Sequence, residues 1–286
     1  MNELAAFSKL ITENNVGAVL VDSYYVTERY LSELKKLTRI YYIDDLNSMI
    51  CPSDVLINYN IYGEESVYRR KYGTDTALLM GPLYAPLRAE FSHIKPRSFG
   101  KIKNVLITSG GTDEFDVIGN VLSRMTGEAA FSDLDYYCVI GRFNRNTDSL
   151  YERYGNDPHI HFLHNINNMS DYMQKCDVCI SAGGTTSYEL CACGLPSIMY
   201  TLADNQTELA GAFSRKGIIP WVGDVRENLP RCMDNIVKEM LLLNDSSYRE
   251  SQSLKMQQIV DGRGAARIAD AVIKKNYEIC LRLSSL

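Results

Sequence analysis

The chain has 286 residues, of which 45% are hydrophobic and 23% are charged. That composition is typical of a folded globular protein and excludes disordered and collagen-like chains. The length corresponds to about two domains. With 30 basic and 35 acidic residues the formal net charge is −5, so we expect no general basic field and no nucleic-acid partner.

The sequence carries no sign of secretion or membrane insertion. Its eight cysteines are spread over a long chain, unlike the dense pattern of a disulfide scaffold. No basic segment followed by an apolar one opens the chain, and apolar runs such as Val16–Val21 are far shorter than the roughly 20 residues of a membrane span. We expect a reduced, cytoplasmic protein with no membrane span, and the sequence does not indicate its oligomeric state.

Strands and helices alternate in the first part of the chain. A helix is expected at Glu3–Glu13 and another at Thr27–Leu37, where Thr27 is a suitable N-cap. The strands are expected at Gly17–Val21, Arg39–Ile43, Val55–Asn58 and Leu78–Met80. Strands and helices at this spacing predict βαβ units and a parallel sheet.

Residues 92–102 are polar, basic and interrupted by Pro96 and Gly100, which favours a linker. A second series of strands and helices follows it. The strands are expected at Asn104–Thr108, Tyr136–Ile140, His159–Leu163, Val178–Ser181, Ser197–Tyr200 and Ile218–Val222. The helices are expected at Val117–Met125, Leu150–Tyr154, Ser170–Lys175, Ser187–Cys193, Gln206–Lys216, Asn235–Leu243 and Ala265–Leu283.

This order of elements predicts an α/β protein with two domains. Residues 103–264 hold enough strands for a complete doubly wound domain, which normally has about five or six. Residues 1–91 hold only part of such a domain, and residues 265–286 are expected to form a C-terminal helix.

Two glycine-rich turns follow strands of the second series and precede helices. The residues are Gly110, Gly111 and Thr112 in the first turn, and Gly183, Gly184 and Thr185 in the second. Glycine lets the backbone approach a ligand closely, and free N–H groups at a helix start favour an anion. Each turn alone could be only a tight turn, but the two together favour a ligand site at the carboxyl edge of the sheet.

Three polar residues near the second turn are further candidates. Glu189 could accept hydrogen bonds from a ribose diol, or could simply complement the dipole of its helix as a solvated residue. Asn205 and Gln206 could bind a sugar or phosphate. For these two, an Asn N-cap followed by a polar helix start is the favoured alternative.

Cysteines and histidines give weaker signals. Cys176, Cys179, Cys191 and Cys193 superficially resemble zinc-ligand spacing, but the pairs fall at distant ends of a strand and a helix, which favours buried cysteines. His159 and His161 point to one face of a strand with no third ligand evident, and His164 follows them. His93 falls in the expected linker. We expect no metal and no cofactor.

Polar and aromatic residues also follow the first strand. Asp22 stands at its end, and Tyr24 comes two residues later. Tyr24 is expected to face a ligand cleft, although an aromatic side chain here could instead pack on the following helix.

Segments along nearly the whole chain resemble one known family. They are VDSYY (21–25), YYIDDL (41–46), DVLINYN (54–60), GPLYAPLRAEF (81–91), TSGGTD (108–113), SAGGTTSYEL (181–190), GLPSI (194–198) and DNQ (204–206). In this order they resemble the UDP-sugar hydrolases of pseudaminic acid biosynthesis, a pathway of bacterial surface glycans. These enzymes release UDP from a UDP-linked diacetamido-trideoxy sugar and are related to two-domain glycosyltransferases.

The resemblance implies a GT-B-like fold, with two Rossmann-like domains and an active site in the cleft between them. It implies a UDP-sugar substrate whose UDP lies against the second domain. The resemblance places Gly183, Gly184 and Thr185 at the diphosphate, Glu189 at the ribose, and Gly110, Gly111 and Thr112 along the cleft. It places Tyr24, Asn205 and Gln206 at the acetamido sugar and Arg88 on the linker side of the pocket. Asp22, because it stands at a strand end at the cleft, is expected to orient Tyr24 or a sugar hydroxyl. Tyr24 and Asn205 are the candidate catalytic residues among these.

One feature of the family has no counterpart here. The family opens with a strand and a GxGHxxR turn that holds the expected histidine base, and no GxGH occurs in the 286 residues. We therefore expect a truncated first domain. The alternatives to a hydrolase are a glycosyltransferase of the same fold and a UDP-sugar-binding remnant without turnover.

Overall fold

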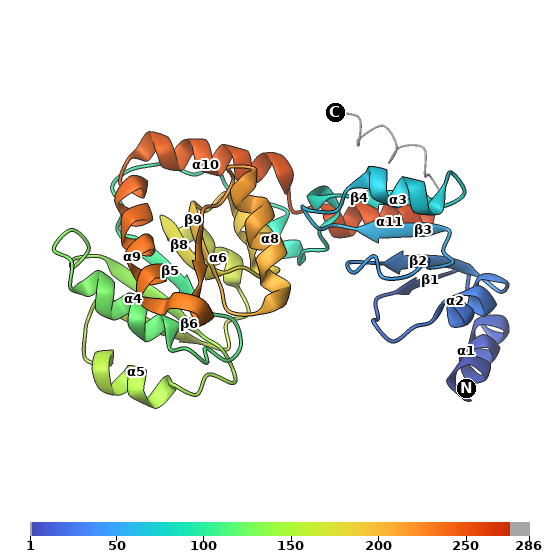
Figure 1. Cartoon of the computed structure of the whole chain (residues 1–286), viewed down its shortest axis with the longest axis horizontal. Helices are drawn as coiled ribbons and strands as arrows, with labels where there is room; N and C mark the ends of the chain where they lie inside the picture. The colour runs from blue at the N-terminus through green and yellow to red at the C-terminus, as the bar shows by residue number, and fades with distance from the viewer. Residues whose placement is uncertain (1, 275–286) are drawn as a thin grey trace. The chain divides into compact units, whose positions relative to one another are not determined.

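The computed structural model describes residues 2–274, which form an α/β protein with two parallel sheets (Figure 1). The chain divides into two compact units. Unit 1 contains the first 86 residues and the segment that begins at Arg263, and unit 2 is Leu87–Gly262. Each unit therefore has a sheet of its own.

Unit 1 is built on a four-stranded sheet in the order β1-β2-β3-β4, with every pair parallel. Its strands are β1 (Ala18–Val21), β2 (Arg39–Ile43), β3 (Val55–Asn58) and β4 (Ala77–Met80). Its helices are α1 (Asn2–Glu13), α2 (Glu28–Lys35), α3 (Glu65–Tyr72), the short η1 (Pro82–Tyr84) and α11 (Gly264–Lys274). Thr27 is the N-cap of α2 as expected, since its side chain accepts a hydrogen bond from Tyr30 N.

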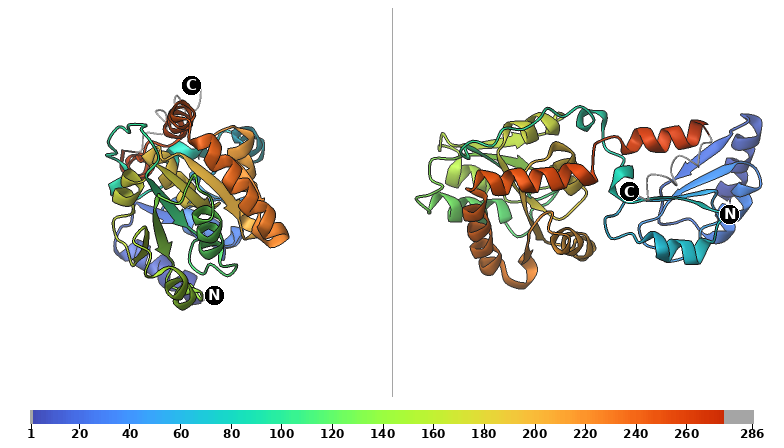
Figure 2. Two further views of the ribbon diagram at one scale, coloured as in Figure 1. Left: turned by 90° about the vertical axis from the view of Figure 1, so that its left-hand side faces the viewer. Right: turned by 90° about the horizontal axis from the view of Figure 1, so that it is seen from above.

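The last described helix packs against the first sheet, although almost the whole chain separates them in sequence. Ile268 and Ala271 of α11 join the core formed by strands β2, β3 and β4, and Tyr41 donates a hydrogen bond of 3.0 Å to Ala271 O. Figure 2 shows α11 running along this sheet. A Cβ at Gly264 would lie 2.1 Å from Ala85 O, so glycine is required where α11 meets the chain after η1. The remainder of the expected C-terminal helix, residues 275–286, lies outside the described residues.

Unit 2 contains a six-stranded parallel sheet in the order β10-β9-β8-β5-β6-β7. This is the strand order of a doubly wound domain, with a crossover between β7 and β8. Its strands are β5 (Asn104–Thr108), β6 (Asp135–Ile140), β7 (Ile160–His164), β8 (Val178–Ala182), β9 (Ser197–Thr201) and β10 (Trp221–Asp224). Its helices are η2 (Ala89–Phe91), α4 (Val117–Thr126), α5 (Thr147–Tyr154), α6 (Met169–Lys175), α7 (Thr186–Cys193), α8 (Asp204–Arg215), α9 (Val225–Leu243) and α10 (Ser246–Ile259).

Helices bury both faces of this sheet. Every second strand residue, such as Val105 and Ile107 of β5, joins one core with α4, α5 and α9. The alternate residues face the other way, where Met199 of β9 lies close to Ala210 of α8. Burial on both faces accounts for the near-continuous apolar runs that mark these strands in the sequence. In the part of the chain that the structure describes, no helix has both the length and the hydrophobicity to cross a bilayer.

The segment expected to be a linker, residues 92–102, instead belongs to unit 2 and is held against it. The Arg97 guanidinium donates to the carbonyl groups of Met173, Cys176 and Cys193, which lie at the carboxyl ends of α6 and α7. One side chain therefore satisfies three carbonyl groups that the two helices leave unpaired. The composition of the segment is that of a linker, but its arginine has a fixed structural partner.

Helix α10 was not predicted, because polar side chains attach it to the unit. Arg249 is fully buried and donates to Leu243 O and Gly100 O. Gln252 receives a hydrogen bond from Ser197 N at 3.2 Å and donates to Ser197 O at 2.9 Å. Buried polar residues at core positions break the apolar periodicity by which a helix is recognised in a sequence.

Other differences are smaller. Helix α3 was not predicted. Helix α9 begins ten residues earlier than the expected Asn235–Leu243. Its first part was not expected to be helical because Pro230 stands inside it, and Asn228 does depart from helical geometry. Strand β10 starts at Trp221 rather than Ile218. Ile218 N still bonds to Phe213 O at the end of α8, and Gly217 has a positive φ of 63°, so the turn occupies the residues that looked like a strand.

The contacts of Gln252 give a prediction for stability. Replacing Gln252 by Leu leaves the N–H and C=O groups of Ser197 buried without partners. Each unsatisfied group costs about 1–3 kcal/mol of folding free energy. We expect Gln252→Leu to lower the free energy of unfolding by about 2–4 kcal/mol in urea denaturation. Gln258→Leu, on the exposed side of the same helix, is the matched control and should change it by less than about 0.5 kcal/mol. Equal effects of the two substitutions would contradict this account of α10.

Candidate functional site

The two glycine-rich turns follow adjacent strands of unit 2. Strands β5 and β8 pair in parallel, with Thr108 opposite Ser181 at their carboxyl ends. The turns begin directly after these residues, on either side of the point where the strand order reverses. That reversal is the usual position of ligand sites in doubly wound sheets.

The first turn offers several free donors. Among residues 2–274 there is no acceptor for the backbone N–H groups of Gly110, Gly111 and Thr112, and all three residues are exposed. Gly110 has a φ of +79°, a conformation that requires glycine. A Cβ built on Gly110 or Gly111 would meet nothing within 4 Å, so open space lies beside this backbone.

In the second turn, the N–H groups that lack an acceptor are not those of the glycines, contrary to expectation. Gly183 N donates to Tyr200 O at 2.8 Å and Gly184 N to Ala182 O at 2.9 Å, so neither glycine has a spare N–H. Gly183 is buried, and a Cβ there would lie 3.1 Å from the sulfur of Met199. The N–H groups without an acceptor in the described chain are those of Thr185 and Thr186, at the start of α7.

A buried aspartate holds the first turn in place. Asp113 is fully buried and accepts hydrogen bonds from Val117 N at 2.8 Å and Ile118 N at 3.3 Å, at the start of α4. Burial raises the pKa of its carboxyl group, and the two backbone donors oppose that rise. Asn146 donates to Asp113 O at 2.6 Å, which ties the turn to the loop after β6. This role of Asp113 was not predicted, although the residue stands in the TSGGTD segment.

Arg88 and Glu189, two residues predicted for the site, lie together in unit 2. The Arg88 guanidinium is 3.6 Å from Glu189 and 2.8 Å from Glu90, which also accepts a hydrogen bond from Ser170. Glu189 is 20% exposed in its side chain. Burial raises the pKa of its carboxyl group, Arg88 lowers it, and Glu90 raises it further. A carboxylate held beside an arginine at the edge of the turn is suited to accept hydrogen bonds from hydroxyl groups.

Asn205 and Gln206 lie in the first turn of α8, after β9, which neighbours β8. The N-cap of this helix is Ala203, so Asn205 does not have the N-cap role considered for it. Asn205 is exposed. Gln206 Oε1 accepts a hydrogen bond from Leu202 N at 2.9 Å, which leaves its amide NH2 group as a donor.

Asp22 and Tyr24 lie after β1, at the carboxyl edge of the sheet in unit 1. Asp22 is exposed. Tyr24 is 64% exposed, yet its hydroxyl donates a hydrogen bond of 2.6 Å to Asp45 Oδ2. That hydrogen bond, followed by burial, raises the pKa of Tyr24 to about 12. Asp45 follows β2 and was missed as a partner, although it stands in the quoted YYIDDL segment.

The cysteines are buried thiols, and the histidines contact other side chains. Cys176, Cys179, Cys191 and Cys193 are all buried free thiols. His159 Nδ1 and His161 Nε2 both lie 3.2 Å from Asp135 Oδ1, so the two rings do share one face, and His164 contacts Tyr151. Across residues 2–274 no three histidine, cysteine or acidic side chains converge in a manner suited to a metal ion.

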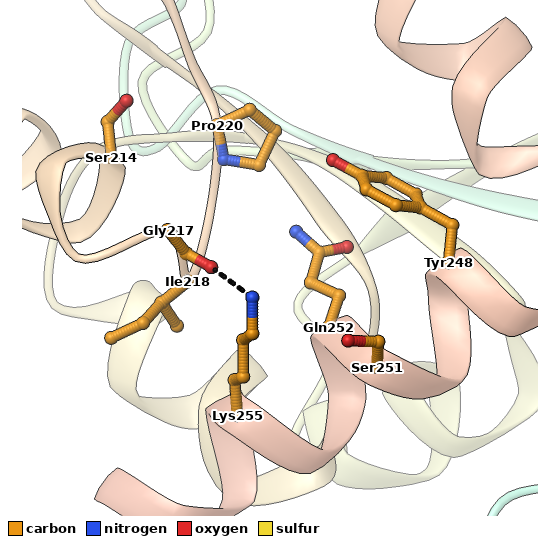
Figure 3. A pocket seen from close by; sticks show the side chains of 8 residues that line it. All are labelled: Ser214, Gly217, Ile218, Pro220, Tyr248, Ser251, Gln252 and Lys255. Atoms are coloured by element: carbon orange, nitrogen blue, oxygen red, sulfur yellow. Dashed lines mark hydrogen bonds between the residues drawn. The ribbon is translucent and has the colours of Figure 1, made fainter.

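A separate pocket lies at the opposite, amino edge of the sheet (Figure 3). It has a volume of about 160 Å³ and is lined by the connection from α8 to β10 and by one face of α10. Lys255 crosses it to donate to Gly217 O at 3.3 Å. The pocket contains no residue of either glycine-rich turn, so it is not part of the candidate site.

The chain is similar to known proteins in both sequence and fold. The spore coat polysaccharide biosynthesis protein SpsG of Bacillus subtilis is 26% identical over 234 residues, covering 79% of this chain and 66% of that protein. A UDP-N-acetylglucosamine–N-acetylmuramyl-(pentapeptide) pyrophosphoryl-undecaprenol N-acetylglucosamine transferase of Helicobacter acinonychis is 29% identical over 113 residues, 37% of this chain and 32% of the transferase. The chain thus spans at most about two thirds of these relatives.

The solved structure of Acinetobacter baumannii MurG superposes with a TM-score of 0.66 at 14% identity, over 95% of this chain and 78% of MurG. The chain therefore has a GT-B-type fold. Residues 104–262, which include both glycine-rich turns and more than half of the chain, match the glycosyltransferase family 28 C-terminal domain. The protein belongs to this family.

Proposed function

We propose that unit 2 binds the UDP part of a nucleotide sugar at its two glycine-rich turns. The observation that carries this proposal is the set of five N–H groups without acceptors in the described chain, at Gly110, Gly111, Thr112, Thr185 and Thr186. They belong to turns after adjacent strands, and the second turn leads into the amino end of α7, where the helix dipole favours an anion. A diphosphate has enough oxygen atoms to accept from both turns.

Glu189 is proposed to hold the ribose. Its helix begins at the second turn, and its carboxylate lies beside the Arg88 guanidinium. An ionised carboxylate accepts hydrogen bonds from two neighbouring hydroxyl groups, as a ribose diol presents them. Arg88 favours the ionised form that this role needs.

The reaction that we propose is hydrolysis of a UDP-linked diacetamido-trideoxy sugar, in the synthesis of a surface polysaccharide. The resemblance of the eight segments to the pseudaminic acid hydrolases supports the substrate. The similarity to SpsG, a spore coat polysaccharide biosynthesis protein, supports the polysaccharide. Water attacks the anomeric carbon and loses one proton to the solvent, the bond from that carbon to the diphosphate oxygen breaks, and UDP leaves with the electron pair. The free N–H groups of the turns stabilise the charge on the departing diphosphate.

Tyr24 is proposed to contact the acetamido sugar. Its hydroxyl proton is already donated to Asp45, so the oxygen is available mainly as an acceptor, for example for an acetamido N–H. Asn205, which is exposed, and Gln206, through its amide NH2 group, are proposed as donors to the sugar. Asp22 is proposed to accept from a sugar hydroxyl.

A second candidate is transfer of the sugar to an acceptor other than water. The match of residues 104–262 to a glycosyltransferase domain and the similarity to the Helicobacter acinonychis transferase favour it. Both candidates use the same UDP site and differ in what attacks the anomeric carbon.

Calorimetry with UDP tests the binding site. We expect Glu189→Ala to weaken UDP binding by about ten- to a hundredfold, because a charge-assisted hydrogen-bond pair to the ribose is lost. Glu208→Ala, which removes an exposed carboxylate from α8, is the matched control and should bind UDP as the unchanged protein does. If the unchanged protein bound no UDP, the proposed function would be wrong, and equal affinity in Glu189→Ala would remove Glu189 from the site.

The reaction is tested by following UDP and free sugar together. With the UDP-linked diacetamido-trideoxy sugar and no acceptor, hydrolysis releases both products in equal amounts. We expect Tyr24→Phe to lower kcat by about tenfold or more, because removing the hydroxyl removes the acceptor for the substrate and the contact with Asp45. Turnover that requires an added glycan or lipid acceptor would support transfer and contradict hydrolysis.

A further inference from the structure

The loop after β6, residues 141–146, is fixed against the first glycine-rich turn. Phe143 N donates to Gly111 O at 3.1 Å. A Cβ on Gly141 would lie 2.3 Å from Gly110 O and 2.4 Å from Gly111 O, so no other residue fits there. The loop and the turn therefore keep one arrangement.

Two asparagines complete this attachment. Asn146 donates from its side chain to Asp113 O, and its own backbone N–H bonds to Asn144 Oδ1 at 2.7 Å. The Asn144 amide also approaches the Asp113 carboxylate, at 3.5 Å. While the asparagines turn inward, Arg142, Phe143 and Arg145 are exposed. Phe143 is 67% exposed, with the Arg142 guanidinium 5.8 Å from its ring centre.

Basic residues are scarce at this edge of the sheet. The connections after β5, β7, β8 and β9 contain none, and the connection after β10 contains Arg226 at the start of α9. Arg226 is engaged by Asp224 and Asp204, each at 2.7 Å. Nearby, Arg153 pairs with Asp116, and Arg88 with Glu90 and Glu189.

Arg142 and Arg145 differ from these arginines. Within residues 2–274 neither one forms a hydrogen bond or an ion pair. They stand one strand away from the first turn, and the connection that continues from that turn to α4 carries acidic side chains at Glu114 and Asp116. Positive charge favours the binding of a diphosphate to a protein of net charge −5, and at this edge of the sheet these two arginines have no ionic partner within residues 2–274.

We propose that Arg142 and Arg145 form a cationic arm that binds the diphosphate of the nucleotide. This inference rests on the proposed function and assigns to it residues outside both turns. Neighbouring strands lie about 4.8 Å apart, so the arm starts roughly 10 Å from the β8 turn, within reach of a diphosphate that bridges the turns. The guanidinium group binds phosphate oxygens in pairs, and the tethered loop lowers the entropic cost of holding it there.

The experiment compares ligands that differ in phosphate content. UDP, UMP and uridine are titrated calorimetrically into the full chain, into Arg142→Ala/Arg145→Ala and into the charge-matched control Arg215→Ala/Lys216→Ala. The control removes two positive charges from the end of α8, at the opposite edge of the sheet. Circular dichroism and thermal unfolding establish that each variant is folded.

We expect the double variant to bind UDP about ten- to a hundredfold more weakly than the unchanged protein does. Its affinity for UMP should fall by a smaller factor, and its affinity for uridine should not change. The dependence of UDP affinity on salt should also become shallower, because fewer exposed charges take part. Arg142→Lys/Arg145→Lys should recover part of the affinity, and the control variant should match the unchanged protein.

The outcomes separate this inference from the proposed function. If the unchanged protein binds UDP and the double variant binds it equally well, the arm is excluded and the UDP site remains. An equal loss of affinity for uridine would also exclude the arm, because it would mean that the loop shapes the nucleoside site rather than neutralising phosphate. Failure of the unchanged protein to bind UDP would overturn the proposed function itself.

Discussion

The pairing of β5 with β8 is the constraint on which the candidate site depends. The chain completes β5, β6 and β7 on one side before it crosses back to place β8 against the free edge of β5. Parallel register then brings Thr108 and Ser181 level, so the turns that follow them are neighbours although more than 70 residues separate them in sequence. If β8 were paired elsewhere, the free N–H groups of the two turns could not reach one ligand.

The sequence predicts the strands well. It predicts the crossover from β7 to β8 only by analogy with doubly wound sheets. Runs such as Arg39–Ile43, Val55–Asn58 and Asn104–Thr108 have the predicted bounds, because a strand buried on both faces is apolar throughout. The glycine pairs also mark the turns correctly. What the pattern could not give is which N–H groups stay free, since that depends on Tyr200 O, a group of a neighbouring strand.

Helix α10, which was not predicted, and residues 92–102, which were expected to be a linker, are both held by polar side chains. Helix α10 depends on Gln252 and Arg249, and the supposed linker depends on Arg97. In a sequence each of these side chains is typical of a solvated surface. Their burial becomes evident only when the carbonyl groups that they satisfy are known. Those groups belong to residues between 6 and 149 positions away in the sequence. Local periodicity carries no information about such pairs.

The N–H groups and the arginines attract an anion by different physical means. The N–H groups are fixed dipoles in the turns, so no charged side chain of the protein has to lose its water when they bind an anion. Arg142 and Arg145 carry full charges in exposed positions, where salt at physiological concentration screens them over about 8 Å. The turns are therefore suited to fix the geometry of the ligand, and ionic strength has little effect on this contribution. The arginines are suited to attract a diphosphate toward an acidic protein and to hold it once it is within reach, and that contribution weakens as salt is added. Under this proposal, the way in which the loop is held matters: backbone and asparagine contacts tether it, and neither arginine has an ion pair within residues 2–274. A carboxylate partner would hold the loop equally well, but it would cancel the charge that the arginines present.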